Sequence, residues 1–343
     1  MTGIDFVHAP LEKREAVSLV RGQVQALLPC IAAQKGVQGC VLLATCNRTE
    51  LYLHGAEGTQ LDALAVLAEA AGFDAAEYRG CSITRTGEDA VHHLMKVAAG
   101  LESQIFGDDQ IVSQVKGAVA LAREAKTVDA VLDTMFRRAV TAGKRVRTET
   151  RLTGVPASAA EVGARRAAQF FGSLEGKRAV VIGNGEMGRL SAALLHEAGC
   201  AVTVTLRTYR HGETVVPAGC AVTPYEERFA AMEGMDILLS ATTSPHYTVS
   251  AEQMSMLKAR PGRVVDLAMP RDVDPAVGDI PGVTLYNVDT LGAEQHRGEL
   301  PQAVTDILAD HMARFYEWNN YRSCLPAIEA LKEAIAQRVL TYP

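Results

Sequence analysis

The sequence lacks any hydrophobic run long enough to cross a membrane. Its 343 residues contain no apolar stretch close to the roughly 18–20 residues that a membrane span needs. The first residues, "MTGIDFVHAPLEKRE", also lack the pattern of a signal peptide. These absences predict a cytoplasmic protein with no membrane partner.

Cysteine is present without any organised spacing. The seven cysteines are an odd number and include no Cys-x-x-Cys pair. This excludes a disulfide framework and a recognisable zinc site. We therefore expect free thiols, no metal site, and one or two cysteines at most with a chemical role.

An excess of positive charge is missing too. The formal net charge is −6, which argues against a globally basic nucleic-acid-binding protein. However, residues 126–151 hold seven Lys or Arg against three Asp or Glu. This local cluster could meet a phosphate backbone, although on charge alone a solvated helix face is the better interpretation.

The chain is longer than a single hydrophobic core supports, so we expect more than one domain. Hydrophobic periodicity predicts an α+β domain over residues 1–152, an α/β domain over 153–295 and a long helix over 296–343, interrupted by Pro326. In the first domain we expect strands at 3–8, 40–45 and around 81–87, and helices at 11–28, 59–72, 87–103, 110–125 and 128–148.

The clearest unit is a strand, a glycine-rich turn, a helix and a second strand within residues 176–207. The apolar strand Ala179–Ile182 runs into Gly183-Asn184-Gly185-Glu186-Met187-Gly188, and a periodic helix then stops at Gly199 before the strand Ala201–Leu206. This context around G-x-G-x-x-G predicts a Rossmann-type, doubly wound dinucleotide-binding domain.

The end of the second strand indicates the cofactor type. An NAD site usually presents an acidic residue there for the ribose 2′-hydroxyl. Here Leu206 is followed by Arg207, Thr208 and, two residues on, Arg210. Arginine suits a 2′-phosphate, so we expect NADPH; two surface arginines are the alternative.

A second feature with chemical content is the stretch "VLLATCNRTELY", residues 41–52. A lone cysteine near a strand end is more often structural than catalytic. Cys46 has Arg48 nearby, which could clamp a carboxylate with two parallel hydrogen bonds, and Thr45 and Asn47 add short polar groups. With a hydride donor downstream, the set suggests acyl transfer to sulfur followed by reduction to an aldehyde.

The sequence resembles the glutamyl-tRNA reductases, the NADPH enzymes that open the C5 pathway of tetrapyrrole synthesis. "LLATCNRTELY" is similar to their signature, and five further stretches follow in the same order over about 300 residues. They are "HHLMKVAAGLESQIFGDDQIVSQVKGAVALAREA", "AGKRVRTETRL", "VIGNGEMG", "DLAMPRDVDP" and "YNVDTL".

The resemblance implies a reaction and a role for each matching residue. Cys46 would attack the ester that joins glutamate to its tRNA, and the thioester would be reduced by NADPH to glutamate-1-semialdehyde. Arg48 would grip the glutamate side chain, and His93 would assist the leaving oxygen or hold the substrate. The pocket would be lined by Thr45, Asn47, Ser103 and Gln114, and the cofactor would be bound by Gly183, Asn184, Gly185, Glu186, Met187, Gly188, Arg207 and Thr208.

The same resemblance implies macromolecular partners. The basic cluster would meet tRNA phosphates, and the aldehyde would pass to glutamate-1-semialdehyde aminomutase. The residues for tRNA would come from Arg137, Arg138, Lys144, Arg145, Arg147 and Arg151.

Several positions depart from the family pattern. Ala44 stands in place of a serine, Asp108 in place of a glutamate and Leu206 in place of an asparagine. The sequence also ends near the point where the family's C-terminal dimerisation domain begins, which makes the usual homodimer doubtful. Two other functions stay open: a non-catalytic paralogue that binds tRNA or a regulator, and an NADPH dehydrogenase of a small free substrate.

Overall fold

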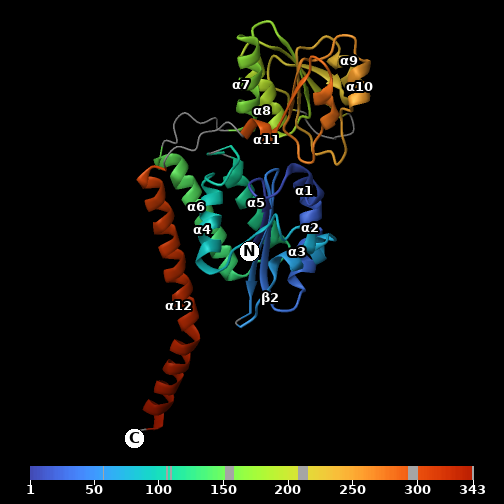
Figure 1. The fold of residues 1–343 in the computed structure, drawn as a ribbon. Coiled ribbons are helices and arrows are strands. Elements are labelled where there is room, and N and C mark those ends of the chain that lie inside the picture. The colour runs from blue at the N-terminus through green and yellow to red at the C-terminus, as the bar shows by residue number, and fades with distance from the viewer. Residues whose placement is uncertain are drawn as a thin grey trace.

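The computed structural model contains two sheets, each with its own helices, and one long C-terminal helix (Figure 1). The two sheet-containing parts meet through loops at the C-terminal edge of the second sheet and through helix α1 (Leu11–Ala16). The structure describes residues 1–56, 58–105, 107–108, 110–150, 158–207, 215–292 and 300–341.

The first sheet is antiparallel, with the strand order β2-β3-β1-β4. Its strands are β1 (Thr2–Asp5), β2 (Val37–Ala44), β3 (Arg48–Gly55) and β4 (Ile83–Thr84). β2 and β3 form a hairpin in which Ala44 pairs with Thr49. This hairpin positions the conspicuous residues 45–48.

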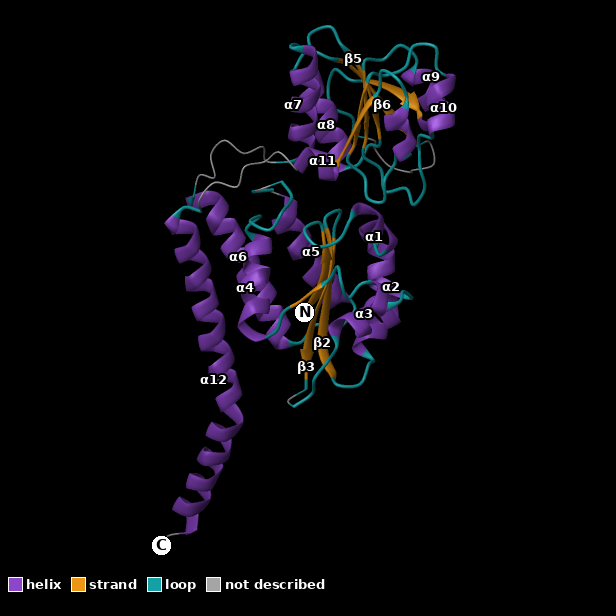
Figure 2. Ribbon diagram, viewed as in Figure 1, coloured by secondary structure: helices purple, strands orange, loops and turns teal. Residues whose placement is uncertain are grey.

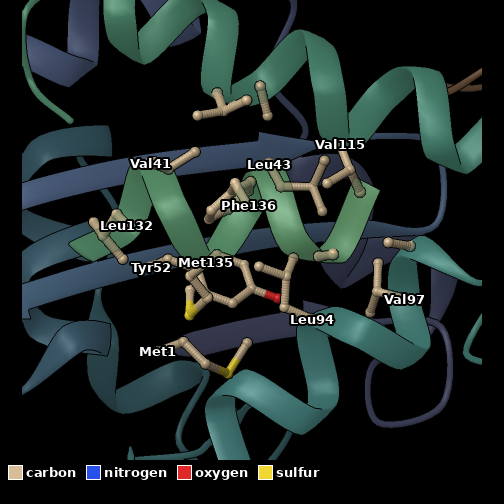
Figure 3. Close-up of a cluster of buried hydrophobic side chains, with 14 of the residues drawn as sticks. Met1, Val41, Leu43, Tyr52, Leu94, Val97, Val115, Leu132, Met135 and Phe136 are labelled. Carbon is tan, nitrogen blue, oxygen red and sulfur yellow. The ribbon is translucent and has the colours of Figure 1, made fainter. Parts of the chain in front are cut away.

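Helices cover both faces of this sheet (Figure 2). They are α2 (Arg21–Ala32), α3 (Ala63–Ala71), α4 (Gly87–Ala98), α5 (Gln110–Glu124) and α6 (Ala130–Glu149). Figure 3 shows how α4, α5 and α6 meet the sheet, with Phe136 packed between Val41, Leu43 and Leu94. The Tyr52 and Phe136 rings meet edge to face at 5.1 Å.

Two expectations for this domain were wrong. The helix expected over 11–28 is two helices, because the chain turns between α1 and α2: the Ser18 hydroxyl donates to the Glu15 carbonyl (2.9 Å) and the Val20 N–H to the Gln23 side chain (2.9 Å). Strand β3 was not expected at all. Its first three residues are polar but fully buried, so it lacks the alternation that marks a half-exposed strand.

The second sheet is parallel, with the order β10-β9-β8-β5-β6-β7. This is the doubly wound order that binds dinucleotides. The strands are β5 (Arg178–Ile182), β6 (Ala201–Leu206), β7 (Ala221–Pro224), β8 (Ile237–Ser240), β9 (Arg263–Asp266) and β10 (Thr284–Asn287). The Rossmann-type fold class expected from the glycine-rich turn is therefore confirmed.

Helices flank both faces of the parallel sheet, over two separate apolar clusters. They are α7 (Ala159–Phe171), α8 (Glu186–Glu197), α9 (Arg228–Met232), α10 (Ala251–Met256) and α11 (Val288–Gly292). Short 3-10 helices span Ala75–Glu77 in the first domain and Tyr225–Glu227 and Pro275–Asp279 in the second.

The last helix, α12 (Gln302–Thr341), is anchored on the first domain. Val304, Ile307, Leu308 and Phe315 are buried in the core that α4 and α6 contribute to. Beyond this anchor, Tyr321, Leu331 and Ile335 are exposed, and the helix extends away from the body (Figure 1). The expected interruption at Pro326 was wrong, because the helix continues through that residue.

Candidate active site

Cys46 lies in the tight turn between β2 and β3. The turn is held by its own backbone: the Thr45 N–H donates to the Arg48 carbonyl at 2.8 Å, and the Phe6 N–H donates to the Asn47 carbonyl at 3.1 Å. Arg14 adds a hydrogen bond to the Cys46 carbonyl at 3.3 Å. The thiol is thus carried on a fixed turn rather than on a strand edge.

A cavity of about 180 Å³ adjoins this turn and lies between the two domains. The first domain contributes Cys46, Asn47, Gln104, Ile105, Asp108, Gln110 and Gln114, and the second contributes Ala159, Met187, Leu267 and Val288. The Gln110 amide also contacts the Met187 sulfur at 2.8 Å. One space therefore joins the candidate nucleophile to the start of the helix that follows the glycine-rich turn.

The Cys46 thiol is protonated at neutral pH in this structure. Burial and, after it, the charge of Asp108 raise its pKa to about 11, while Arg14 and Arg48 act in the opposite direction. The side chain is nevertheless only half-buried, because it opens onto the cavity. Since the thiolate is the nucleophile, the site needs a further source of activation.

Behind the turn, Arg48 and His93 share one buried carboxylate. Glu50 accepts hydrogen bonds from Arg48 Nη1 (2.7 Å), from His93 Nε2 (2.9 Å) and from the Tyr52 hydroxyl (2.6 Å). Burial alone would raise the pKa of Glu50, but the charge of Arg48 and these hydrogen bonds outweigh it and lower the pKa to about 2. The carboxylate is therefore ionised at neutral pH.

Four of the expected site residues, Thr45, Arg48, His93 and Ser103, are not among the described residues that line the cavity. Arg48 is only 2% exposed and donates its second terminal nitrogen to the Glu102 carbonyl. His93 and Ser103 are buried, and the Thr45 hydroxyl accepts from the Asn47 N–H at 3.2 Å. Asn47 and Gln114 do line the cavity beside Cys46.

A second cavity, of about 230 Å³, lies at the C-terminal edge of the parallel sheet. Its walls include four of the expected cofactor residues, Gly183, Asn184, Gly185 and Arg207. The Arg207 guanidinium stacks on the Tyr225 ring at 4.8 Å. No acidic side chain is among the described residues that line it: Gly183, Asn184, Gly185, Thr205, Leu206, Arg207, Tyr225, Ala241, Thr242 and Thr243. Thr208 and Arg210 lie outside the described residues.

The glycines of the turn fit a dinucleotide for steric reasons. Gly183 has φ +107°, which disfavours any other residue. A Cβ on Gly188 would lie 2.8 Å from the Gly183 carbonyl carbon, so helix α8 could not approach the strand. The buried Asn184 Oδ1 has no protein partner among the described residues. Glu186 begins α8 and Met187 faces the other cavity.

Two buried aspartates support the edge of this cofactor cavity. Asp272 accepts hydrogen bonds from Ser240 (2.7 Å) and from the backbone and hydroxyl of Thr242, a cavity residue. Burial and the neighbouring charge of Asp272 raise the pKa of Asp266 to about 8. The Asp266 carboxyl accepts the Ala268 and Val273 N–H groups, which fixes the loop after β9.

Sequence reasoning missed the polar residues between α4 and the start of α5. Gln104 and Asp108 of the loop and Gln110, the first residue of α5, line the cavity together with Cys46. They lie in the stretch "ESQIFGDDQ", which separates two apolar helices and ends with several polar side chains. That concentration of amides and carboxylates was the available signal.

Known proteins are similar to this chain over most of its length. Residues 2–150 match the family model of the glutamyl-tRNAGlu reductase N-terminal domain, and residues 165–293 match that of shikimate/quinate 5-dehydrogenase. Over 329 residues the chain is 39% identical to a glutamyl-tRNA reductase of Acetivibrio thermocellus, an alignment that covers 95% of this chain and 98% of the relative. The chain belongs to the glutamyl-tRNA reductase family.

Two other glutamyl-tRNA reductases are similar to this chain over nearly its whole length. A glutamyl-tRNA reductase of Alkaliphilus oremlandii is 35% identical and is covered over 99% of its length. The solved glutamyl-tRNA reductase of Methanopyrus kandleri is 29% identical, with a TM-score of 0.51, over 99% of this chain and 87% of that one. The family resemblance and the nicotinamide-dependent oxidoreductase class are thus confirmed.

Two features are absent among the described residues. None of the helices they form combines the length and the apolar character of a bilayer-spanning segment. Within the same ranges, no three His, Cys, Asp or Glu side chains are grouped as metal ligands.

Proposed function

We propose that this chain reduces glutamyl-tRNA to glutamate-1-semialdehyde with NADPH, as the first step of tetrapyrrole synthesis. The observation that carries the proposal is the cavity that Cys46 shares with Met187 of helix α8. A glutamyl group in this cavity would contact both the thiol of Cys46 and the start of the helix that follows the glycine-rich turn. Membership of the reductase family supports the choice of substrate.

The first step of the proposed reaction transfers the glutamyl group to sulfur. The Cys46 sulfur bonds to the ester carbonyl carbon, the bond to the ribose oxygen breaks, and that oxygen leaves on the tRNA with the proton of the thiol. Covalent attachment then holds a carbonyl that is more reactive than the ester, at a fixed position. The Asn47 and Gln114 amides beside Cys46 orient the acyl group.

NADPH, when bound, supplies the hydride that reduces the thioester, and the aldehyde forms as the carbon–sulfur bond breaks and sulfur regains a proton. Residues 183–185 hold the pyrophosphate side through their backbone. Arg207, at the end of β6, meets the 2′-phosphate that distinguishes NADPH from NADH.

The buried Arg48–Glu50–His93 group completes the proposed site. Arg48 lies behind the turn, where Glu50 and Glu102 hold its terminal nitrogens, and it supports the Cys46 turn from there. Its grip on the glutamate side-chain carboxylate requires that the buried Nε–H, which has no partner among the described residues, be reached from the cavity. His93 acts on the site through Glu50. The Thr45 hydroxyl holds the Cys46 turn by accepting the Asn47 N–H, and Ser103 is buried in the loop after α4, where its N–H donates to the Gly100 carbonyl (3.3 Å).

Helix α6 presents the proposed tRNA surface. Arg137, Lys144 and Arg147 are exposed on it, and their charges suit a phosphate backbone. Arg145 is half-buried and bonded to Glu149 (2.8 Å) and Asp310 (3.1 Å), and Arg138 is half-buried as well. Arg151 lies outside the described residues. In this proposal the product passes to glutamate-1-semialdehyde aminomutase.

The decisive experiment is mass spectrometry of the protein mixed with charged tRNA but no NADPH. We expect a glutamyl adduct on Cys46, and semialdehyde on addition of NADPH. Cys46→Ser should lose both, while Cys30→Ser, which changes an exposed thiol, should keep both. Turnover by the Cys46→Ser variant, or NADPH oxidation without an adduct, would refute the proposal.

A further inference from the structure

Two amide oxygens beside Cys46 have no hydrogen-bond partner among the described residues. They are Asn47 Oδ1 and Gln104 Oε1, and both residues line the cavity. Gln104 is only 9% exposed. Buried polar atoms are nearly always satisfied, so an unsatisfied pair in one cavity indicates a ligand that donates hydrogen bonds.

The orientation of the Gln104 side-chain amide is set by its NH2 group. Its Nε2 donates to the Asp289 carboxylate at 3.0 Å, and a carboxylate can only accept. The amide therefore cannot be flipped, and the group left for a ligand is the acceptor Oε1. This amide selects a donor and rejects a carboxylate.

The charge of the cavity also favours a hydrogen-bond donor, and a positively charged one. Among the described residues that line it, Asp108 is the only one that carries a formal charge, and none is Lys, Arg or His. A primary ammonium group has three N–H donors and one positive charge. Two amide oxygens and one carboxylate match it in both number and sign.

We propose that Asn47, Gln104 and Asp108 form the binding site for the α-ammonium group of the aminoacyl substrate, and that this cation activates Cys46. The inference rests on the proposed function, because it presupposes that the acyl group reaches this thiol. It assigns the free amine of the substrate, rather than its side chain, to this part of the cavity.

The activation follows from the charges that act on the thiol. Asp108 raises the pKa of Cys46, whereas Arg14 and Arg48 lower it. An ammonium group bound next to Asp108 cancels the repulsion between that carboxylate and a thiolate and adds an attraction. The nucleophile therefore becomes reactive only when an aminoacyl group with a charged amine is in place, which protects it from other electrophiles.

The test compares glutamyl-tRNA with the same tRNA carrying N-acetylglutamate, which has no positive charge. Formation of the Cys46 thioester is measured in single turnover without NADPH, so that reduction does not enter. The wild-type protein should acylate about tenfold or more faster with the free amine; a tenfold ratio corresponds to ~1.4 kcal/mol. Equal rates with both substrates would overturn the proposal.

Asp108→Asn separates this role from a structural one, because the proposal gives it two effects of opposite sign. Without substrate, loss of the carboxylate should lower the pKa of the thiol and speed its alkylation by iodoacetamide. With the free amine it should slow acylation by about tenfold, and with the acetylated substrate it should not. Faster acylation by both substrates would contradict the inference.

Two further variants keep the result interpretable. Gln104→Met removes the unpartnered oxygen at similar size, and it should lower the ratio between the two substrates. Glu77→Gln removes an exposed carboxylate of the first domain that pairs with Lys13 (2.9 Å) and does not line the cavity, and it should leave the ratio unchanged. If neither substrate acylates wild-type Cys46, the proposed function fails rather than the ammonium site.

Discussion

Glu50 is a fully buried carboxylate on strand β3. Removing a charge from water is costly, and a buried charge is retained only with a counter-charge and further hydrogen bonds. Arg48, His93 and Tyr52 together satisfy it. Loss of the carboxylate would in turn leave the Arg48 guanidinium buried without its ion-pair partner.

We expect Glu50→Gln to lower the free energy of unfolding at pH 7 by about 3–5 kcal/mol, the usual cost of breaking a buried ion pair. The folded-state pKa of Glu50, about 2, lies below its ordinary value of 4.5. Its stabilisation is therefore complete above pH 4.5 and is lost as the pH falls towards 2. Urea unfolding at several pH values should show the two proteins converging in acid.

The matched control is Glu77→Gln, because Glu77 forms an ion pair with Lys13 (2.9 Å) whose side chains are exposed. That change should cost less than about 1 kcal/mol. A Glu50→Gln protein that unfolds like this control at pH 7 would show that the buried network contributes little.

At the scale of single residues, the sequence predicted some of the side chains that line the cavity but not the contacts of the others. Cys46, Asn47 and Gln114 share the cavity as expected. The partners of Arg48 were not foreseeable without strand β3, since only the two-residue period of a strand places Arg48, Glu50 and Tyr52 on one face. Three polar residues buried in succession contradict the pattern by which strands are recognised.

Helix α6 crosses α4 at Gly143, and the crossing depends on the missing side chain. A Cβ at this position would lie 2.7 Å from the Ala98 carbonyl carbon and 3.2 Å from a Val112 methyl group. Backbone cannot yield as a flexible side chain does, so this glycine permits the close approach of the two helices. The proposed tRNA surface lies on the same helix.

We expect Gly143→Ala to destabilise the protein by about 1–3 kcal/mol, the range for overpacked cores. Alanine favours helices over glycine, so the clash must exceed that gain. Gly117→Ala in neighbouring α5 is the opposite case: its Cβ would meet nothing within 4 Å, and we expect a gain of about 0.5–1 kcal/mol. Thermal unfolding of both variants checks the prediction, which fails if their shifts have the same sign.

Elements with strong periodicity were the ones that could be predicted. Helices α5 and α6 and strands β5 and β6 lie within a few residues of their expected positions. The break after α1 was missed because Val17, Leu19 and Val20 continue an apolar pattern through the turn. Helix α12 passes through Pro326, although proline usually ends or kinks a helix.

On the scale of the whole molecule, helix α1 joins the two domains. Its neighbouring residues Arg14 and Glu15 each form an ion pair with the second domain. Arg14 pairs with the carboxylate of Asp289, and Glu15 pairs with the guanidinium of Arg271. Such contacts link residues more than 250 positions apart, so no local pattern could predict them. They hold the cavity closed between its two walls.

The Glu15–Arg271 pair can test whether these contacts hold the two domains together, because it lies away from the Cys46 turn. Glu15 accepts the Arg271 backbone N–H (2.7 Å), Nε (2.9 Å) and Nη2 (2.6 Å), and both side chains are mostly buried. Arg271→Glu would replace these bonds by repulsion from Glu15 and Glu12. We expect thioester formation, whose nucleophile and proposed ammonium-binding residues all belong to the first domain, to keep most of its rate.

Reduction of the thioester should instead slow by about tenfold or more in Arg271→Glu, because hydride transfer depends on how closely the two domains hold their reacting groups. The exchanged pair, Glu15→Arg with Arg271→Glu, restores opposite charges and should recover part of the loss. Lys13→Gln, which breaks an ion pair within the first domain, serves as the control and should affect neither step. Rapid-quench measurement of both steps decides: equal slowing of acylation and reduction, or an exchanged pair as slow as the single variant, would mean that these contacts do not set the distance between the domains.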